Sequence, residues 1–155
     1  MERNTDLIEV LNDLIQINND RVVGYEKASN ALSAADVDLK ALFSQYSAES
    51  RKYTTELSAE VGKLGGEPST STTGSGKIYR TWMDVKAIFT GKDRHAVLEN
   101  CEFGEDAAQK AYDEALKSDA VMDTEIRQLI TNQKSSLRVA HDTIKKYRDM
   151  HEIAK

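Results

Sequence analysis

The segment Gly65-Gly-Glu-Pro-Ser-Thr-Ser-Thr-Thr-Gly-Ser-Gly76, with the continuation Lys77-Ile-Tyr-Arg-Thr-Trp-Met-Asp-Val-Lys-Ala-Ile-Phe89, decides the fold of this chain. It holds the only proline and separates two long stretches of helical periodicity. Polar, glycine-containing residues 69–76 are typical of a linker, and the apolar spacing in 77–89 predicts a short amphipathic helix. We therefore interpret residues 65–92 as a crossover between two helical hairpins.

Apolar residues recur at helical spacing on both sides of this crossover, which predicts four long helices. Thr5 or Asp6, Asp36, Asp93, and Ser118 or Asp119 are suitable N-cap residues for them. Gly65 is placed to end the second helix, because a glycine readily adopts the left-handed conformation at that position. The predicted helices span residues 6–32, 37–64, 94–117 and 120–151.

The lengths of the connections predict the topology. Short turns make the first two helices antiparallel neighbours, and the same holds for the last two. Each helix is about 40 Å long, and the crossover can travel that distance, which a turn between adjacent helix ends does not require. We therefore expect a single all-α domain over residues 1–155, a four-helix bundle connected up-down-down-up. One long crossover is the ferritin-like variant of such bundles.

Composition excludes several classes of function. The formal net charge of −5 argues against nucleic acid or an anionic membrane as a partner. The apolar runs are too short to span a bilayer, and the polar beginning of the sequence does not resemble a signal segment. A single cysteine, Cys101, excludes an intrachain disulfide. Together these features favour a cytoplasmic protein.

Polar residues interrupt the apolar stripe of each long helix near the middle of the bundle. One interpretation is a central polar layer whose members hydrogen-bond to each other and fix the register of the helices. The helical phase leaves open whether Glu49 or Ser50 points inward. The predicted layer consists of Asn18, Ser50 or Glu49, Glu105 and Gln133.

The alternative is a metal site, because carboxylates and histidine at one level of a bundle can bind iron, manganese or zinc. A ferritin-like di-iron centre takes one Glu from each of two helices and a Glu-x-x-His pair from each of the others. Here Lys52 follows Glu49 where a His is required, and Arg138 precedes His141 where a Glu is required. The di-iron set is therefore incomplete. The remaining candidate metal ligands are Glu26, Glu49, Glu105 and His141.

The predicted short helix 77–89 has two interpretations. It closes the flank of the bundle, or it presents an apolar patch to a second copy of the chain or to another protein. The residues of that predicted interface are Tyr79, Trp82 and Met83.

Several segments resemble an uncharacterised bacterial family of ferritin-like four-helix-bundle proteins, a domain of unknown function. The matching segments are Leu11-Asn-Asp-Leu-Ile-Gln-Ile-Asn-Asn-Asp20, Gly24-Tyr-Glu-Lys-Ala28, Lys63-Leu-Gly-Gly-Glu-Pro68, Trp82-Met-Asp-Val-Lys-Ala-Ile-Phe-Thr-Gly-Lys-Asp93, and Gly104-Glu-Asp-Ala-Ala108 with Tyr112. The resemblance covers nearly the whole chain. It implies a ferritin-like bundle in a bacterial cytoplasm and brings no established activity.

We therefore expect a non-catalytic bundle with a structural or protein-interaction role. The alternative is a metal-binding or metal-dependent redox protein that uses the central carboxylates and histidine. A third interpretation is a small apolar or aromatic ligand held between the helices, with tyrosines and Glu105 as polar anchors.

Overall fold

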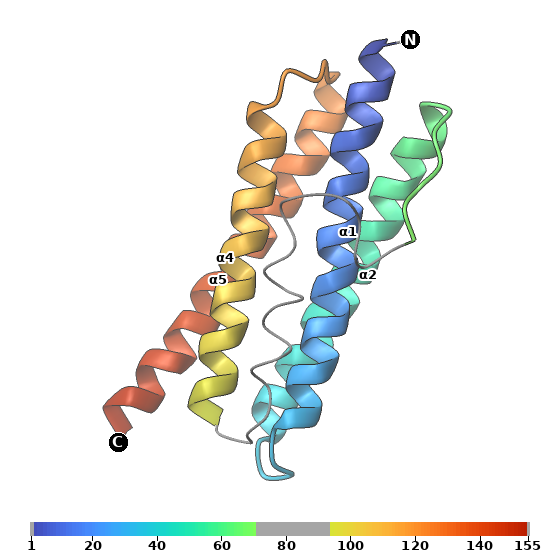
Figure 1. Cartoon of the computed structure of the whole chain (residues 1–155). Helices are drawn as coiled ribbons and strands as arrows, with labels where there is room; N and C mark the ends of the chain where they lie inside the picture. Colours follow the sequence, from blue (N-terminus) through green and yellow to red (C-terminus); the bar gives the residue numbers. More distant parts are fainter. Residues whose placement is uncertain (1, 71–93, 155) are drawn as a thin grey trace.

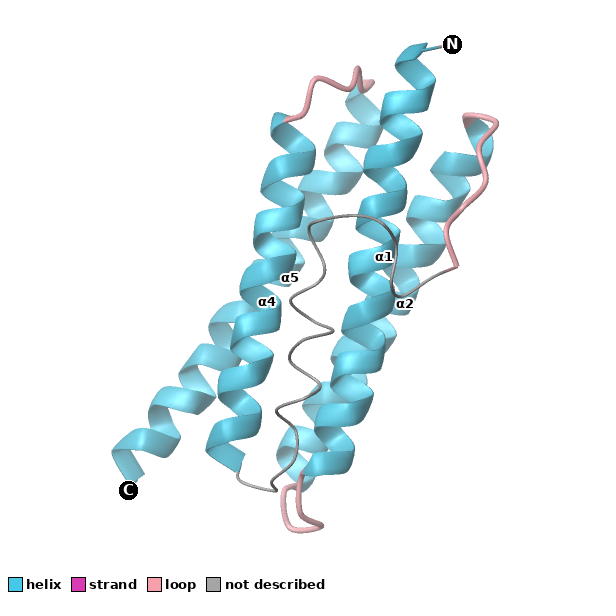
Figure 2. Ribbon diagram, in the orientation of Figure 1, coloured by secondary structure: helices cyan, strands magenta, loops and turns pink. Residues whose placement is uncertain are grey.

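The computed structural model describes residues 2–70 and 94–154, and every regular element in those ranges is a helix (Figures 1 and 2). The predicted helix 77–89 and the predicted interface residues Tyr79, Trp82 and Met83 lie outside the described residues. The four helices are α1 (Glu2–Ala31), α2 (Val37–Lys63), α4 (Arg94–Lys117) and α5 (Thr124–Ala154).

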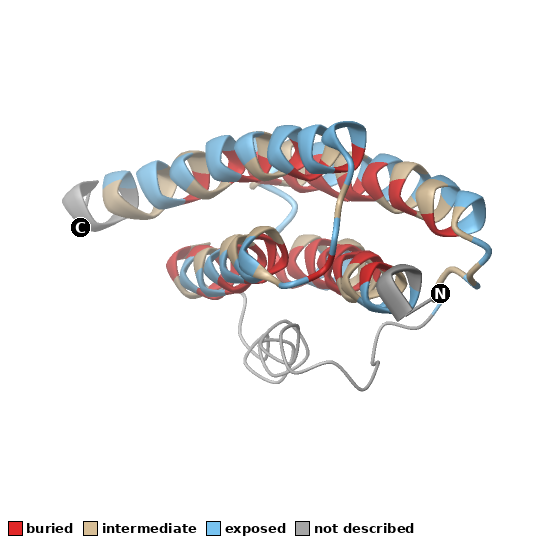
Figure 3. Cartoon of the chain, turned by 90° about the horizontal axis from the view of Figure 1, so that it is seen from above, coloured by how far each residue is buried: buried red, intermediate tan, exposed pale blue. Residues whose placement is uncertain are grey.

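The helices form a bundle of two layers. Figure 3 shows α1 beside α4 in one layer and α2 beside α5 in the other, with the buried sides of the helices turned inward. In Figure 1, α1 and α5 run in one direction while α2 and α4 run in the other. The up-down-down-up connection predicted from the length of the crossover is therefore confirmed. The packing of α1 against α2 and of α4 against α5 is more extensive than that of α2 against α5.

The apolar core follows the predicted periodicity. On α2, residues buried at alternating steps of three and four face the interior, as expected for helices packed in a bundle. On α1 the buried line runs through Leu7, Leu11, Leu14 and Tyr25, each at most 3% exposed. The buried positions of α2 are Leu39, Phe43, Tyr46, Ser47, Ser50, Tyr53, Leu57 and Val61.

The end of α2 is as predicted. Gly65 has φ of +83°, a conformation that glycine adopts without steric cost. Its N–H donates to the carbonyl of Gly62 at 3.0 Å, and the N–H of Gly66 donates to that of Val61 at 3.0 Å. These two bonds make a Schellman motif, which satisfies carbonyls at the helix end.

Two helix starts differ from the prediction. The first helix begins at Glu2, before the expected caps Thr5 and Asp6, since no helix-breaking residue separates them from the start. The last helix begins at Thr124 instead of residue 120. There Asp123 is the cap, because its Oδ1 accepts a 2.8 Å hydrogen bond from the N–H of Ile126.

The turn between α1 and α2 is tied to the start of α4. Asp36 occupies the predicted N-cap position of α2, but its carboxylate accepts hydrogen bonds from Ser33 instead of capping the helix. Arg94 at the start of α4 binds Asp36 at 2.9 Å and both carboxylate oxygens of Asp38 at 2.8 and 3.0 Å. This contact fixes the first residue of α4 against the opposite hairpin.

No helix in the described ranges is long and apolar enough to cross a membrane.

Candidate functional site: a buried arginine at the centre of the bundle

The side chain of Arg21, on α1, lies at the centre of the polar layer and is fully buried. Its guanidinium binds Glu105 of α4 in a bidentate arrangement. Nε donates to Oε1 at 3.0 Å, and Nη2 donates to Oε2 at 2.8 Å. Glu105 is also fully buried, so this ion pair joins α1 to α4 in the absence of solvent. Charge-assisted hydrogen bonds are about twice as strong as neutral ones, and the bidentate arrangement adds geometric specificity.

The remaining edge of the guanidinium faces α2. Nη1 of Arg21 donates to Ser50 Oγ at 2.8 Å, to Glu49 Oε1 at 3.0 Å and to the carbonyl oxygen of Tyr46 at 3.2 Å. Ser50 is fully buried, whereas the side chain of Glu49 is 23% exposed. Ser50 therefore points into the core, and Glu49 reaches Arg21 from its edge.

Two tyrosines enclose the ion pair. The hydroxyl of Tyr25 donates to Glu105 Oε2 at 2.6 Å. The Cζ atom of Arg21 lies 5.3 Å from the centre of the Tyr25 ring and 5.2 Å from that of Tyr46, within range of a cation–π interaction. The aromatic rings thus cover the guanidinium, and each of its three nitrogens donates to a polar partner.

A directional chain of hydrogen bonds leads away from Arg21. Ser50 accepts from Arg21 and donates to Asn18 Oδ1 at 2.8 Å, and Asn18 Nδ2 donates to the Tyr112 hydroxyl at 2.8 Å. That hydroxyl donates to Gln133 Oε1 at 2.6 Å, and Gln133 Nε2 donates to Glu56 Oε1 at 3.1 Å. The chain therefore runs from a cation to a carboxylate and uses side chains of all four helices.

This chain contains three of the residues predicted for the polar layer. Asn18, Ser50 and Gln133 are 1%, 0% and 2% exposed, and each both accepts and donates within the chain. Because every hydrogen bond of this chain joins two different helices, the network specifies how the four helices are aligned.

Burial and charge shift the pKa values of the central groups. Burial acts to lower the pKa of Arg21, but Glu105, Tyr25 and Glu49 outweigh it, so the pKa is raised and the guanidinium stays charged. Burial raises the pKa of Glu49, with Glu105 adding to the effect and Arg21 opposing it. Burial, reinforced by Glu105, also raises the pKa of Cys101 well above its usual range. This thiol is thus held in its unreactive protonated form.

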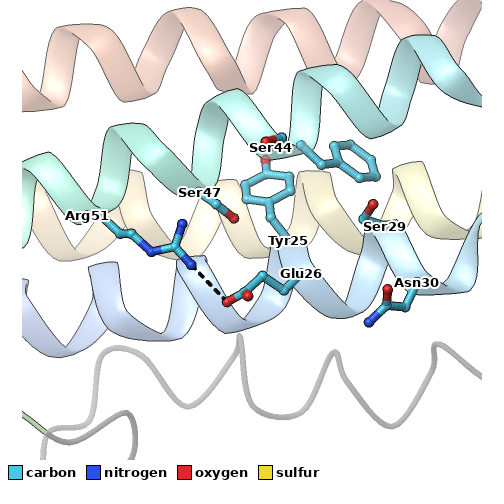
Figure 4. A pocket seen from close by; sticks show the side chains of 8 residues that line it. Tyr25, Glu26, Ser29, Asn30, Ser44, Ser47 and Arg51 are labelled. Atoms are coloured by element: carbon cyan, nitrogen blue, oxygen red, sulfur yellow. Dashed lines mark ion pairs between the residues drawn. The ribbon is translucent and has the colours of Figure 1, made fainter.

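The structure does not bring the four candidate metal ligands together. Glu49 and Glu105 meet only through Arg21, which lies between them. Glu26 is on the surface, where it pairs with Arg51 at 3.4 Å at the rim of a cavity of about 270 Å³ between α1 and α2 (Figure 4). His141 contacts Asp106 at 2.5 Å and Asp142 at 3.0 Å. Among the described residues no group of three or more His, Cys, Asp or Glu side chains could hold a metal ion.

The central residues also do not fit a di-iron centre. Lys52 and Arg138, at the positions tested for a Glu-x-x-His pair, are both exposed. The inward positions of α2 at that spacing are Ser50 and Tyr53 instead. Arg21 places its positive charge between Glu49 and Glu105, and it occupies both oxygens of Glu105.

Sequence reasoning missed Arg21 because it placed only Asn18, of the polar residues on α1, in the central layer. The line that the structure buries contains Arg21, seven residues after Leu14 and four before Tyr25. Two glutamates at the depth of this arginine, one on each of two other helices, were the available signal: they require a buried cation.

Comparison with known proteins supports the fold. The family described as Domain of unknown function (DUF2383) matches residues 6–118. No curated protein matches the sequence. Among solved structures, one described as ferritin-like, diiron-carboxylate proteins from Bacillus anthracis superimposes with a TM-score of 0.62 at 15% identity. The match covers 99% of this chain and 98% of the other. At this identity the likeness shows a ferritin-like fold and carries no activity to this chain.

Proposed function

The chain belongs to the family described as Domain of unknown function (DUF2383), and from its central site we propose that it is a non-catalytic ferritin-like bundle acting through protein contacts. The observation that carries this proposal is the contact of Arg21 with Glu49 and Glu105. Carboxylates that a metal would need are bound to a guanidinium that belongs to the chain. In this proposal the bundle is a rigid scaffold whose outer surface binds other proteins. We place it in the cytoplasm.

Metal analysis tests the absence of a metal centre. The purified protein is loaded in turn with iron, manganese and zinc, passed over a desalting column, and analysed for bound metal by mass spectrometry. We expect far less than one metal ion per chain, because Arg21 already neutralises Glu105.

A stoichiometric metal would contradict the proposal. Two matched variants would then locate the site, since Glu105 is buried and Glu26 is more than half exposed. Loss of the metal in Glu105→Gln but not in Glu26→Gln would establish the central carboxylates as ligands and support the metal-binding alternative.

We propose that residues Tyr79, Trp82 and Met83 of this chain bind a second copy of the chain or another protein. Light scattering gives the mass of the wild type in solution. If it is a dimer, Trp82→Ala is expected to shift it toward the monomer. The control is Val37→Ala, which removes an apolar side chain that is 68% exposed at the start of α2. A dimer that persists in Trp82→Ala, or a monomeric wild type, would remove the second copy as the partner.

A further inference from the structure

The charged end of Arg21 is bound as a separate planar cation would be bound. Nε and Nη2 engage the two oxygens of Glu105, while Nη1 engages Ser50, Glu49 and the carbonyl of Tyr46. The rings of Tyr25 and Tyr46 lie within 5.3 Å of its Cζ atom. These partners come from α1, α2 and α4. The bundle therefore recognises the shape of the group as well as its charge.

The partners also require a cation at this place. Glu105 is fully buried, and the Glu49 carboxylate approaches the same point from α2. Without a positive charge between them, the fully buried carboxylate of Glu105 would face the partly buried carboxylate of Glu49. Buried charges are tolerated only when paired, so the loss of the guanidinium leaves a demand for another cation.

We propose that the place held by the Arg21 guanidinium is a binding site for a planar organic cation, and that it takes up a free guanidinium compound when the arginine side chain is shortened. In the wild-type chain the Arg21 side chain fills this place, and the surrounding acceptors match its fork-shaped group. The inference rests on the proposed function in one respect, the absence of a metal between Glu49 and Glu105. Its test uses variants of Arg21, so it can fail while the metal analysis of the wild type succeeds.

The test is chemical rescue. Arg21→Ala removes the group beyond Cβ, and ethylguanidinium matches the missing atoms. We expect millimolar ethylguanidinium chloride to raise the melting temperature of Arg21→Ala by several degrees and to reach saturation. Wild type and Lys27→Ala, which loses an exposed cation of the same helix, should not respond. N-ethylurea, which has a similar shape but no charge, and sodium chloride should have no effect on Arg21→Ala.

Three results would overturn the inference. One is no rise with ethylguanidinium, and a second is an equal rise with N-ethylurea. The third is a rise with manganese or zinc alone, which would show that the vacated site prefers a metal to a planar group.

A second comparison applies if Arg21→Ala does not fold. Arg21→Met leaves the carboxylates unpaired, whereas the triple variant Arg21→Met, Glu49→Gln, Glu105→Gln removes the charges together. We expect the triple variant to recover the helical circular dichroism and cooperative unfolding that Arg21→Met loses. If the triple variant is as unfolded as Arg21→Met, the carboxylates do not create the need for a cation, and the inference is wrong.

Discussion

The two carboxylates bound to Arg21 are expected to contribute to stability in opposite directions. Glu105 is fully buried, bidentate and bonded to Tyr25, so Glu105→Gln breaks a buried pair. We expect it to lower the free energy of unfolding by about 3–5 kcal/mol. Equilibrium unfolding in urea at neutral pH measures the loss.

Glu49→Gln is the matched variant, and its expected effect differs. The pKa of Glu49 is raised above its ordinary 4.5, chiefly by burial, so its ionised form destabilises the folded state at neutral pH. As the pH falls toward this raised pKa, Glu49 takes up a proton in the folded state, and the folded state becomes more stable. We therefore expect Glu49→Gln to be at least as stable as wild type at pH 7 and to lose this pH dependence. A loss as large as that of Glu105→Gln would contradict the assignment of unequal roles.

Tyr112 links α1 to α5 in the hydrogen-bond chain, since its hydroxyl accepts from Asn18 and donates to Gln133. Tyr112→Phe keeps the ring and removes that hydroxyl. It leaves buried polar groups of both neighbours without this partner, which costs about 1–3 kcal/mol. Urea unfolding measures the change. Tyr147→Phe, at a partly buried position of α5, is the control and should change stability little, whereas equal effects of the two variants would argue against a continuous chain.

At the level of the helices, Arg94 ties the start of α4 to the first hairpin. Its hydrogen bonds lower the pKa of Asp38 from 3.8 to about 2. A lowered carboxyl pKa means that the stability is present above pH 4 and is lost as the pH falls from about 4 toward 2. Because Asp38 is about half exposed, solvent screening limits its contribution to about 0.5 kcal/mol.

Asp38→Asn should therefore lower the stability slightly at pH 7 and reduce its decline below pH 4. Thermal unfolding across this range, compared with Asp119→Asn, provides the measurement. Asp119 is an exposed carboxyl between α4 and α5, and the carboxylates that Arg94 binds are those of Asp36 and Asp38. An unchanged slope in Asp38→Asn would show that the tie to Arg94 does not contribute.

A helix end could be predicted from the sequence where the backbone conformation allows only one type of residue. It could not be predicted where several residues are equally suitable caps. Gly65 could be identified because the end of α2 needs a positive φ. The start of α5 was placed too early because Ser118, Asp119 and Asp123 are all acceptable caps in the sequence. Only the packed structure selects Asp123, whose carboxylate accepts from Ile126.

For the whole molecule, the fold followed from the sequence because connection length and apolar periodicity are independent of side-chain detail. Only part of the central site could be predicted from the sequence. Asn18, Ser50, Glu105 and Gln133 interrupt apolar stripes visibly, whereas Arg21 lies on a line whose selection depends on the rotation of α1. A small rotation of α1 about its own axis moves neighbouring residues between core and surface, and the sequence does not determine that rotation.

The roles assigned to Glu49 and Glu105 depend on the guanidinium of Arg21, and not a metal, being the cation of the bundle centre. The most direct measurement is the NMR signal of the Arg21 Nε–H, assigned with Arg21→Lys, recorded as manganese is added. We predict a signal protected from exchange with water that stays sharp at one manganese ion per chain, because Nε is bound to Glu105 in the interior. Selective broadening of that signal by stoichiometric manganese would place a metal at the centre and contradict the account.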